Sequence, residues 1–124
     1  MAPSKARPEA DRRSTVLYLT TTGRQSGRPR RIEIWFTRRN RRYYVIAETG
    51  EDAQWVRNLR ADPRVAWHVG KVTSRGRARV VDGAGESALR AAVRAASAAK
   101  YGWGNGLVVE LGPDRSARRA SARS

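Results

Sequence analysis

The chain has 124 residues, no cysteine, and 26 Lys or Arg residues against 11 Asp or Glu. This length fits one domain with a modest core, and the lack of cysteine excludes disulfides, thiolate metal sites and a cysteine nucleophile. No segment approaches the roughly 20 apolar residues of a membrane span. The excess of positive charge, mostly Arg, indicates an anionic partner: nucleic acid, anionic lipid or a phosphorylated, acidic cofactor.

The two ends of the sequence differ in composition from its middle. Residues 1–13 are rich in Pro, Ala and charge and predict a flexible arm, and residues 113–124 lack large apolar side chains and predict a disordered tail. The folded domain is therefore predicted over residues 14–112. The N-terminal segment has no apolar run typical of a secretory signal, so we expect a cytoplasmic protein.

Three strands are predicted in the first half of the domain. Residues 15–22 are β-branched and aromatic, and a turn with two Gly and one Pro follows them. Residues 31–37 alternate apolar and polar side chains, and the next strand is predicted at residues 42–48. One face of the second strand carries Ile32, Ile34 and Phe36. Together the three segments predict an antiparallel meander.

The second half mixes helices with strands. Residues 51–62 have apolar side chains at helical spacing and end before Pro63, which predicts a helix. Strands at 64–69 and 72–82 form a predicted hairpin, and a closing strand is predicted at 106–111. The helix predicted at 87–101 has an apolar stripe of Leu89, Ala92, Val93 and Ala96. The fold class predicted is α+β but mainly β, a small barrel with flanking helices.

The turn between the first two strands, Thr20–Arg31, reads TTTGRQSGRPRR and has the composition of an anion site. Its glycines allow backbone geometries that direct N–H groups at an anion, and its arginines can form bidentate bonds to phosphate or carboxylate. The groups in question are Gly23, Gly27, the hydroxyls of Thr21, Thr22 and Ser26, and Arg24, Arg28 and Arg30. The alternative is an ordinary connecting turn with solvated arginines.

Three segments, LTTTGRQSGRPRRIEIWF, RYYVIAE and QWVRNLRADPRVAWHVG, together resemble the deazaflavin-dependent nitroreductase family. The resemblance covers about residues 17–81. It implies a split β-barrel of six to seven antiparallel strands with two flanking helices, of the FMN-binding split-barrel type. It also implies a homodimer, because in such small barrels a second copy often completes the pocket.

The same resemblance implies a site for coenzyme F420 at the turn. The phosphate and acidic tail of the cofactor would be held by Thr22, Gly23, Arg24, Gln25, Ser26, Gly27 and Arg30. Trp55 and Asn58, at positions i and i+3 of the helix, would border the cofactor, although Trp55 alternatively packs in the core. The sequence departs from the family pattern at Gln25, where Lys is usual and where Arg28 and Arg31 could supply the missing cation, and at residues 48–51. Carboxylates stand there instead of a Ser-Lys-Gly-Gly-like run, and near an anionic tail they would repel it.

Three side chains are candidates for a proton donor to the substrate. Tyr101 ranks first because it adjoins the flexible aromatic segment Gly102–Gly104, which contains Trp103 and could line a substrate pocket, although a Tyr at a helix end more often packs with its hydroxyl in solvent. Tyr44 and His68 follow. His68 is the single histidine of the chain, so no metal site is expected.

Two classes of function remain open from the sequence. The first is an oxidoreductase that transfers hydride from reduced F420 to a quinone, a nitro compound or an activated alkene, with FMN as the alternative cofactor. The second is a basic nucleic-acid-binding module, in which Arg38–Arg42 follow the phosphates and Trp35, Tyr43 and Tyr44 stack on bases. The basic tails would bind nucleic acid only weakly.

Overall fold

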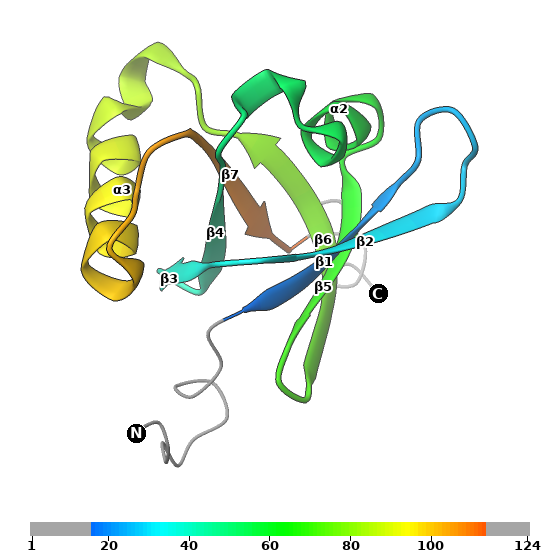
Figure 1. Cartoon of the computed structure of the whole chain (residues 1–124), viewed down its shortest axis with the longest axis horizontal. Helices are drawn as coiled ribbons and strands as arrows, with labels where there is room; N and C mark the ends of the chain where they lie inside the picture. Colours follow the sequence, from blue (N-terminus) through cyan, green and yellow to red (C-terminus); the bar gives the residue numbers. More distant parts are fainter. Residues whose placement is uncertain (1–15, 114–124) are drawn as a thin grey trace, which may run out of the picture.

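A computed structural model describes residues 16–113 (Figure 1). The predicted N-terminal arm and all of the predicted tail except Pro113 lie outside these residues. The described chain forms a seven-stranded antiparallel sheet in the order β2-β1-β5-β6-β7-β4-β3. The strands are β1 Leu17–Thr22, β2 Pro29–Ile34, β3 Thr37–Arg39, β4 Arg42–Ala47, β5 Arg64–Val69, β6 Val72–Val80 and β7 Leu107–Gly112. The helices are the 3-10 turns η1 Gly50–Asp52 and η2 Ala84–Glu86 and the α-helices α2 Gln54–Ala61 and α3 Ser87–Tyr101.

The sheet curls until its two edge strands are joined by only two residues. β2 and β3 lie at opposite edges, and Trp35 and Phe36 carry the chain from one edge to the other. The predicted single strand at 31–37 and the three-stranded meander are therefore wrong at this point, because β4 pairs with β3 and β7 and not with β2. The predicted alternation still holds through the crossing, since Phe36 is buried and Trp35 is 44% exposed.

The barrel interior holds the main core, and each α-helix covers a different surface (Figure 1). Val56 and Leu59 of α2 pack into the main core at one end of the barrel. Val93 of α3 packs against the outer side of β4 and β7. The predicted stripe of α3 is wrong at Ala96, which is exposed. Ser97 is buried instead, and its hydroxyl donates to the carbonyl oxygen of Trp103 at 2.6 Å.

The hairpin between β1 and β2 extends beyond the sheet and passes beside α2 (Figure 1). The helix begins only at Gln54, because Ala53 is extended and separates it from η1. The predicted helix at 51–62 is thus two shorter elements. This break places the side chains of Gln54, Trp55 and Asn58 opposite the hairpin, where they line a cavity with it.

Candidate functional site

Two open cavities lie along β2, which is an edge strand of the sheet. The first, here called the hairpin cavity, has a volume of about 720 Å³. Its lining is Gly23, Arg24, Gln25, Ser26, Pro29, Arg30, Arg31, Ile32, Gln54, Trp55 and Asn58. The second, here called the tryptophan cavity, has a volume of about 630 Å³. Its lining is Val16, Glu33, Ile34, Trp35, Ile46, Ala47, Glu48, Thr49, Ala53, Trp55 and Trp103.

The turn of the hairpin is closed by its own hydrogen bonds. The N–H of Gly23 donates to the Arg28 carbonyl at 2.8 Å, and the N–H of Gly27 donates to the Gly23 carbonyl at 2.8 Å. Ser26 Oγ accepts from the N–H of Arg28 at 3.1 Å. Gly27 has a φ of +73°, which favours glycine. The N–H groups of Gly23 and Gly27 are therefore bonded within the turn, and the positive charge of the turn comes from its side chains.

Arg24 is held against α2 by amide groups. Its Nη1 donates to Asn58 Oδ1 at 2.9 Å and its Nη2 donates to Gln54 Oε1 at 2.8 Å. Asn58 is only 5% exposed, and its Nδ2 donates to Thr21 Oγ1 at 3.2 Å. The side chain of Arg24 is thus oriented by neutral partners that leave its positive charge uncompensated.

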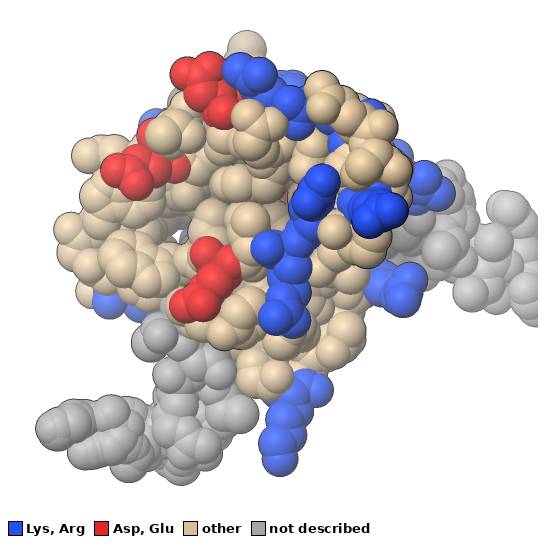
Figure 2. Space-filling view, turned by 45° about the vertical axis from the view of Figure 1, so that its right-hand side comes forward, with Lys and Arg blue, Asp and Glu red and all other residues tan. Residues whose placement is uncertain are grey.

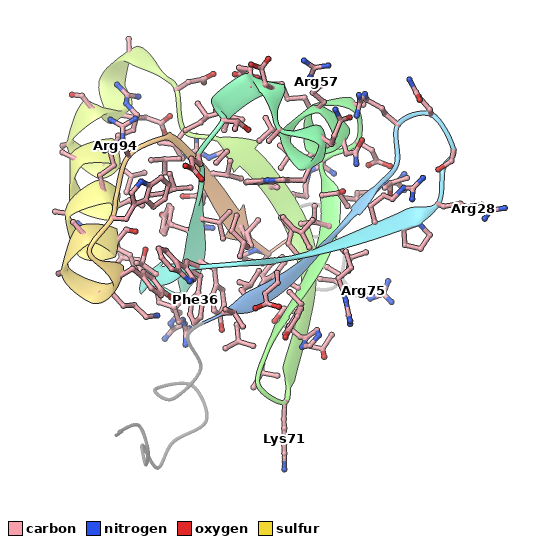
Figure 3. All side chains as sticks on the ribbon, in the orientation of Figure 1. Arg28, Phe36, Arg57, Lys71, Arg75 and Arg94 are labelled. Carbon is pink, nitrogen blue, oxygen red and sulfur yellow. The ribbon has the colours of Figure 1, made fainter. Side chains whose placement is uncertain are left out.

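No carboxylate lines the hairpin cavity within the part of the chain that the structure describes. Arg24, Arg30 and Arg31 line it, and Arg31 also lies over the ring of Tyr18 at 5.0 Å. Arg28 sits at the turn and points away from the body of the protein (Figure 3). By contrast, four arginines of α2, β5 and β6 have acidic partners: Arg57 pairs with Asp52, Arg60 with Glu51 and Asp82, Arg64 with Asp62, and Arg79 with Glu86 and Glu110. Figure 2 shows Lys and Arg side chains along the right-hand part of one face and acidic side chains to their left.

The tryptophan cavity is aromatic and carries the opposite charge. Trp35, Trp55 and Trp103 line it, and its only charged lining residues are Glu33 and Glu48. One wall comes from the end of β2 and the other from the end of β4 and the following residues, so the cavity lies in the split between these strands. Trp55 belongs to both cavities.

The sequence led us to expect the carboxylates at 48–51 near the acidic tail of the cofactor. The structure differs, because these carboxylates do not line the hairpin cavity. Glu51 is tied to Arg60 through contacts of 2.6 and 2.8 Å, and this hydrogen bonding lowers the pKa of Glu51. Glu48 lines the tryptophan cavity. Neither residue lines the cavity that contains Arg24.

Tyr101 lies at the crossing between β2 and β3 and lines neither cavity. Its hydroxyl donates to the Phe36 carbonyl at 2.8 Å and accepts from the Phe36 N–H at 3.1 Å. Lys100 Nζ donates to the same carbonyl at 3.0 Å. Burial raises the pKa of Tyr101 and lowers the pKa of Lys100. The ring of Tyr101 stacks on Trp35 with a centroid distance of 4.5 Å and an interplanar angle of 3°.

The other two candidate proton donors also lie outside both cavities. Tyr44 is buried, and its hydroxyl donates to Glu110 at 2.7 Å. Burial, with this bond to Glu110 as the next cause, raises the pKa of Tyr44 to about 12. His68 stacks on Tyr18 at 4.8 Å on the outer face of the sheet. Residues 16–113 contain no group of three His, Asp or Glu side chains that could hold a metal ion.

The structure brings most of the predicted cofactor residues together. The hairpin cavity is lined by Gly23, Arg24, Gln25, Ser26, Arg30, Trp55 and Asn58. Thr22 and Gly27 do not line it; Thr22 lies on the opposite face of β1 from the buried Thr21. Sequence reasoning missed Gln54 and, apart from Trp55 and Trp103, the lining of the tryptophan cavity. It considered Arg31 only as a replacement for the cation missing at Gln25. The available signal was the alternation at 31–37, which places Glu33 and Trp35 on one face of β2.

Comparisons with known proteins identify a family and related folds. The family described as F420H(2)-dependent quinone reductase matches residues 8–106. A solved F420-H2 dependent reductase, FDR-A, is 24% identical with a TM-score of 0.59, covering 79% of this chain and 94% of its own. HutZ, the heme storage protein of Vibrio cholerae, is 22% identical with a TM-score of 0.69, covering 84% of each chain. A structure described as a domain-swapped dimer is 22% identical with a TM-score of 0.58, covering 79% and 80%.

These likenesses to solved structures concern the fold, and they confirm the predicted split β-barrel with two flanking helices. The number of strands agrees with the upper end of the prediction. In the described part of the chain, neither α-helix has the length and apolar composition to cross a membrane.

Proposed function

We propose the following function for this chain, which belongs to the F420H(2)-dependent quinone reductase family and is therefore an oxidoreductase. It binds coenzyme F420 with the phosphate and acidic tail in the hairpin cavity. It then serves the transfer of hydride to a small organic acceptor, of which quinones are the first class to test and nitro compounds and activated alkenes the next. We place it in the cytoplasm as part of the same proposal.

The observation that carries this proposal is the charge of the hairpin cavity. Arg24, Arg30 and Arg31 line one cavity, and no acidic side chain of residues 16–113 lines it with them. Cations gathered in this way repel one another, and an anion between them relieves the repulsion. The hydroxyl of Ser26 adds a donor, since its oxygen already accepts from Arg28. These groups fit a ligand with a phosphate and several carboxylates better than the single phosphate of FMN.

The neighbouring tryptophan cavity fits the flat ring of the same cofactor. Three indoles line it, and aromatic surfaces favour stacking with a planar heterocycle. The edge strand β2 also leaves backbone N–H and C=O groups without a strand partner on one side, and these can bond to a ring edge. When bound in its reduced form, the deazaflavin supplies the hydride. The protein contributes binding, orientation and an apolar wall of indoles against which the ring can pack.

The proposal includes a homodimer. The tryptophan cavity is open, and Trp35 is 44% exposed at its wall, so a second copy would complete the enclosure. One structural neighbour is described as a domain-swapped dimer. The nucleic-acid alternative finds less support, because Arg38 lies over Tyr43 at 4.6 Å and Tyr44 is buried. Tyr44 is therefore not available for stacking on a base, and one face of Tyr43 is already covered.

A titration of the full chain with coenzyme F420, followed by deazaflavin fluorescence, tests the proposal. We expect saturable binding, and Arg24→Ala should weaken it by roughly 30- to 100-fold, because removing one member of a hydrogen-bonded charge pair costs several kcal/mol. Arg64→Ala is the matched control, since Arg64 is paired with Asp62 outside both cavities. Equal losses in both variants, or no binding at micromolar protein, would contradict the proposal.

A further inference from the structure

We infer that Glu33 and Glu48 make the tryptophan cavity selective for the charge of the electron acceptor. The cavity takes flat aromatic acceptors that are neutral or positively charged and disfavours anionic ones. This inference rests on the proposed function, because an acceptor must lie against the deazaflavin ring to receive hydride and therefore shares the tryptophan cavity with that ring. It concerns Glu33 and Glu48, and Glu48 is a position at which this sequence departs from the family pattern.

The inference begins with how the acidic side chains are paired. Among residues 16–113, the other carboxylates each form an ion pair with an arginine: Glu51, Asp52, Asp62, Asp82, Glu86 and Glu110. Glu33 and Glu48 form none within the same range. In a chain with 26 Lys or Arg residues, an acidic side chain readily finds a cationic partner. Both exceptions nevertheless line one cavity.

The two carboxylates come from opposite sides of the split. Glu33 belongs to β2 and Glu48 directly follows β4, so a ligand that enters between these strands passes both side chains. No Lys or Arg of residues 16–113 lines this cavity. The walls around the two charges are largely apolar, and apolar walls strengthen the interaction of a charge with a ligand.

The direction of the effect follows from the charge of the rest of the molecule. With a formal net charge of +15, the protein attracts anions in general. An anionic acceptor would be drawn to the same surface as the acidic cofactor tail. Two negative side chains at the acceptor cavity oppose this attraction locally. Partly solvated charges at such a site change the affinity of a singly charged ligand by roughly tenfold.

The experiment compares two probes that share a ring and differ in charge: 2-methyl-1,4-naphthoquinone, which is neutral, and 1,4-naphthoquinone-2-sulfonate, which is an anion. Quenching of tryptophan fluorescence in the full chain without coenzyme reports binding, since Trp35, Trp55 and Trp103 line the cavity. The absence of cysteine removes thiol arylation as a side reaction. The variants are Glu33→Gln, Glu48→Gln and the double variant. The matched control is Glu51→Gln, whose carboxylate is paired with Arg60 outside the cavity.

We expect the wild type to prefer the neutral probe by roughly tenfold, and the double variant to reduce this ratio to within about twofold through tighter binding of the sulfonate. Glu51→Gln should keep the wild-type ratio. The series is repeated with Arg24→Ala, because the sulfonate can also meet the arginines of the hairpin cavity. With coenzyme present, the ratio of kcat/KM for the two quinones should shift in the same direction, and comparing variant with wild type cancels their different reduction potentials.

Several results would overturn the inference: no preference in the wild type, an unchanged ratio in the double variant by both readouts, or an equal change in Glu51→Gln. A failure of the proposed function looks different. If coenzyme F420 does not bind but the charge preference persists and disappears in the double variant, the function is wrong and the selectivity stands. If the coenzyme binds and Arg24→Ala weakens its binding, but the ratio of affinities for the two probes stays unchanged in the Glu33 and Glu48 variants, only the selectivity is wrong.

Discussion

The hairpin cavity and the tryptophan cavity share the edge strand β2 and the side chain of Trp55, yet their lining differs in charge and in polarity. Arginines and amides line the first, which has no acidic side chain among the described residues. Indoles, aliphatic side chains and two carboxylates line the second, with no cation among those same residues. A single ligand that lies along β2 would therefore meet positive charge at one end and an apolar, acidic surface at the other.

The charges that line the two cavities differ from the ion pairs found elsewhere in the described structure. Outside the cavities, arginines of α2, β5 and β6 hold carboxylates at distances such as 2.6 Å between Arg60 and Glu51. Inside them, Arg24 is bound to amides and Glu33 and Glu48 have no ion pair. An ion pair within a cavity would cancel the charge that a ligand could use. Separated charges keep each cavity able to bind a different part of a ligand.

The first prediction concerns a variant that gives Arg24, in the hairpin cavity, an ion-pair partner. Asn58→Asp places a carboxylate where an amide oxygen now accepts from Arg24 at 2.9 Å. The hydroxyl of Thr21 can rotate to donate to the new oxygen, so the packing should be preserved. We expect binding of coenzyme F420 to weaken by roughly 10- to 30-fold, because Arg24 is neutralised in place. Deazaflavin fluorescence measures the affinity.

Asn58→Ala tests the effect of the orientation of Arg24 separately from the effect of its charge. This variant leaves the charge of Arg24 free but removes the amide that orients it and leaves buried groups without partners. We expect it to destabilise the fold by about 1–3 kcal/mol in urea unfolding. Its affinity for the coenzyme should remain above that of Asn58→Asp at equal folded fraction. The reverse order would show that orientation of Arg24, and not its charge, limits binding.

The second prediction uses salt to distinguish the cavities. Raising the ionic strength from about 0.05 M to 0.5 M should weaken coenzyme binding roughly tenfold, because screening acts on charges at an open, solvent-filled site. Binding of the neutral 2-methyl-1,4-naphthoquinone to the tryptophan cavity should change by less than about twofold. Arg24→Ala should reduce the salt dependence of the affinity for the coenzyme. A neutral quinone that weakened in parallel with the coenzyme would contradict the separation of the two sites.

The third prediction concerns Tyr101, whose role as proton donor stays a prediction. Tyr101→Phe keeps the stack on Trp35 but removes the hydroxyl that bonds to the backbone of Phe36. Because this hydroxyl lies outside both cavities, we expect kcat to fall less than about threefold and the KM for the quinone to rise severalfold through movement of Trp35. Loss of a general acid would instead lower kcat by roughly 100-fold or more. Steady-state kinetics at saturating coenzyme decide between the two roles.

Most of the residues predicted to bind the cofactor line the hairpin cavity, and they are close along the chain or one helical turn apart. Arg24, Gln25 and Ser26 occupy one turn, and Trp55 and Asn58 share a face of α2. The family resemblance then joined the two segments. The actual partner of Asn58 was not predictable, since its contacts with Arg24 and Thr21 depend on how the hairpin meets the helix.

The tryptophan cavity could not be predicted in the same way. It forms because the chain crosses from β2 to β3 at Trp35 and Phe36, which leaves β2 at one edge and β4 near the other. Alternation at 31–37 gave the correct faces but not the break between two strands. Glu48 and Trp103 reach the cavity only through strand pairing across the whole sheet, and pairing order depends on long-range contacts that a local pattern does not contain.

The smallest effect is expected in the paired region, from Arg60→Gln. The hydrogen bond from Arg60 lowers the pKa of Glu51, so the stabilisation from this pair is present above the unfolded-state pKa of about 4.3 and is lost as the pH falls through the lower folded-state value. Urea unfolding should therefore show a slight loss of stability at pH 7 that disappears in acid. Coenzyme affinity should stay within about twofold of the wild type, because Arg60 lines neither cavity and exposed pairs contribute little. A loss of affinity as large as that of Asn58→Asp would mean that total positive charge, and not the unpaired arginines at β2, sets the binding of the coenzyme.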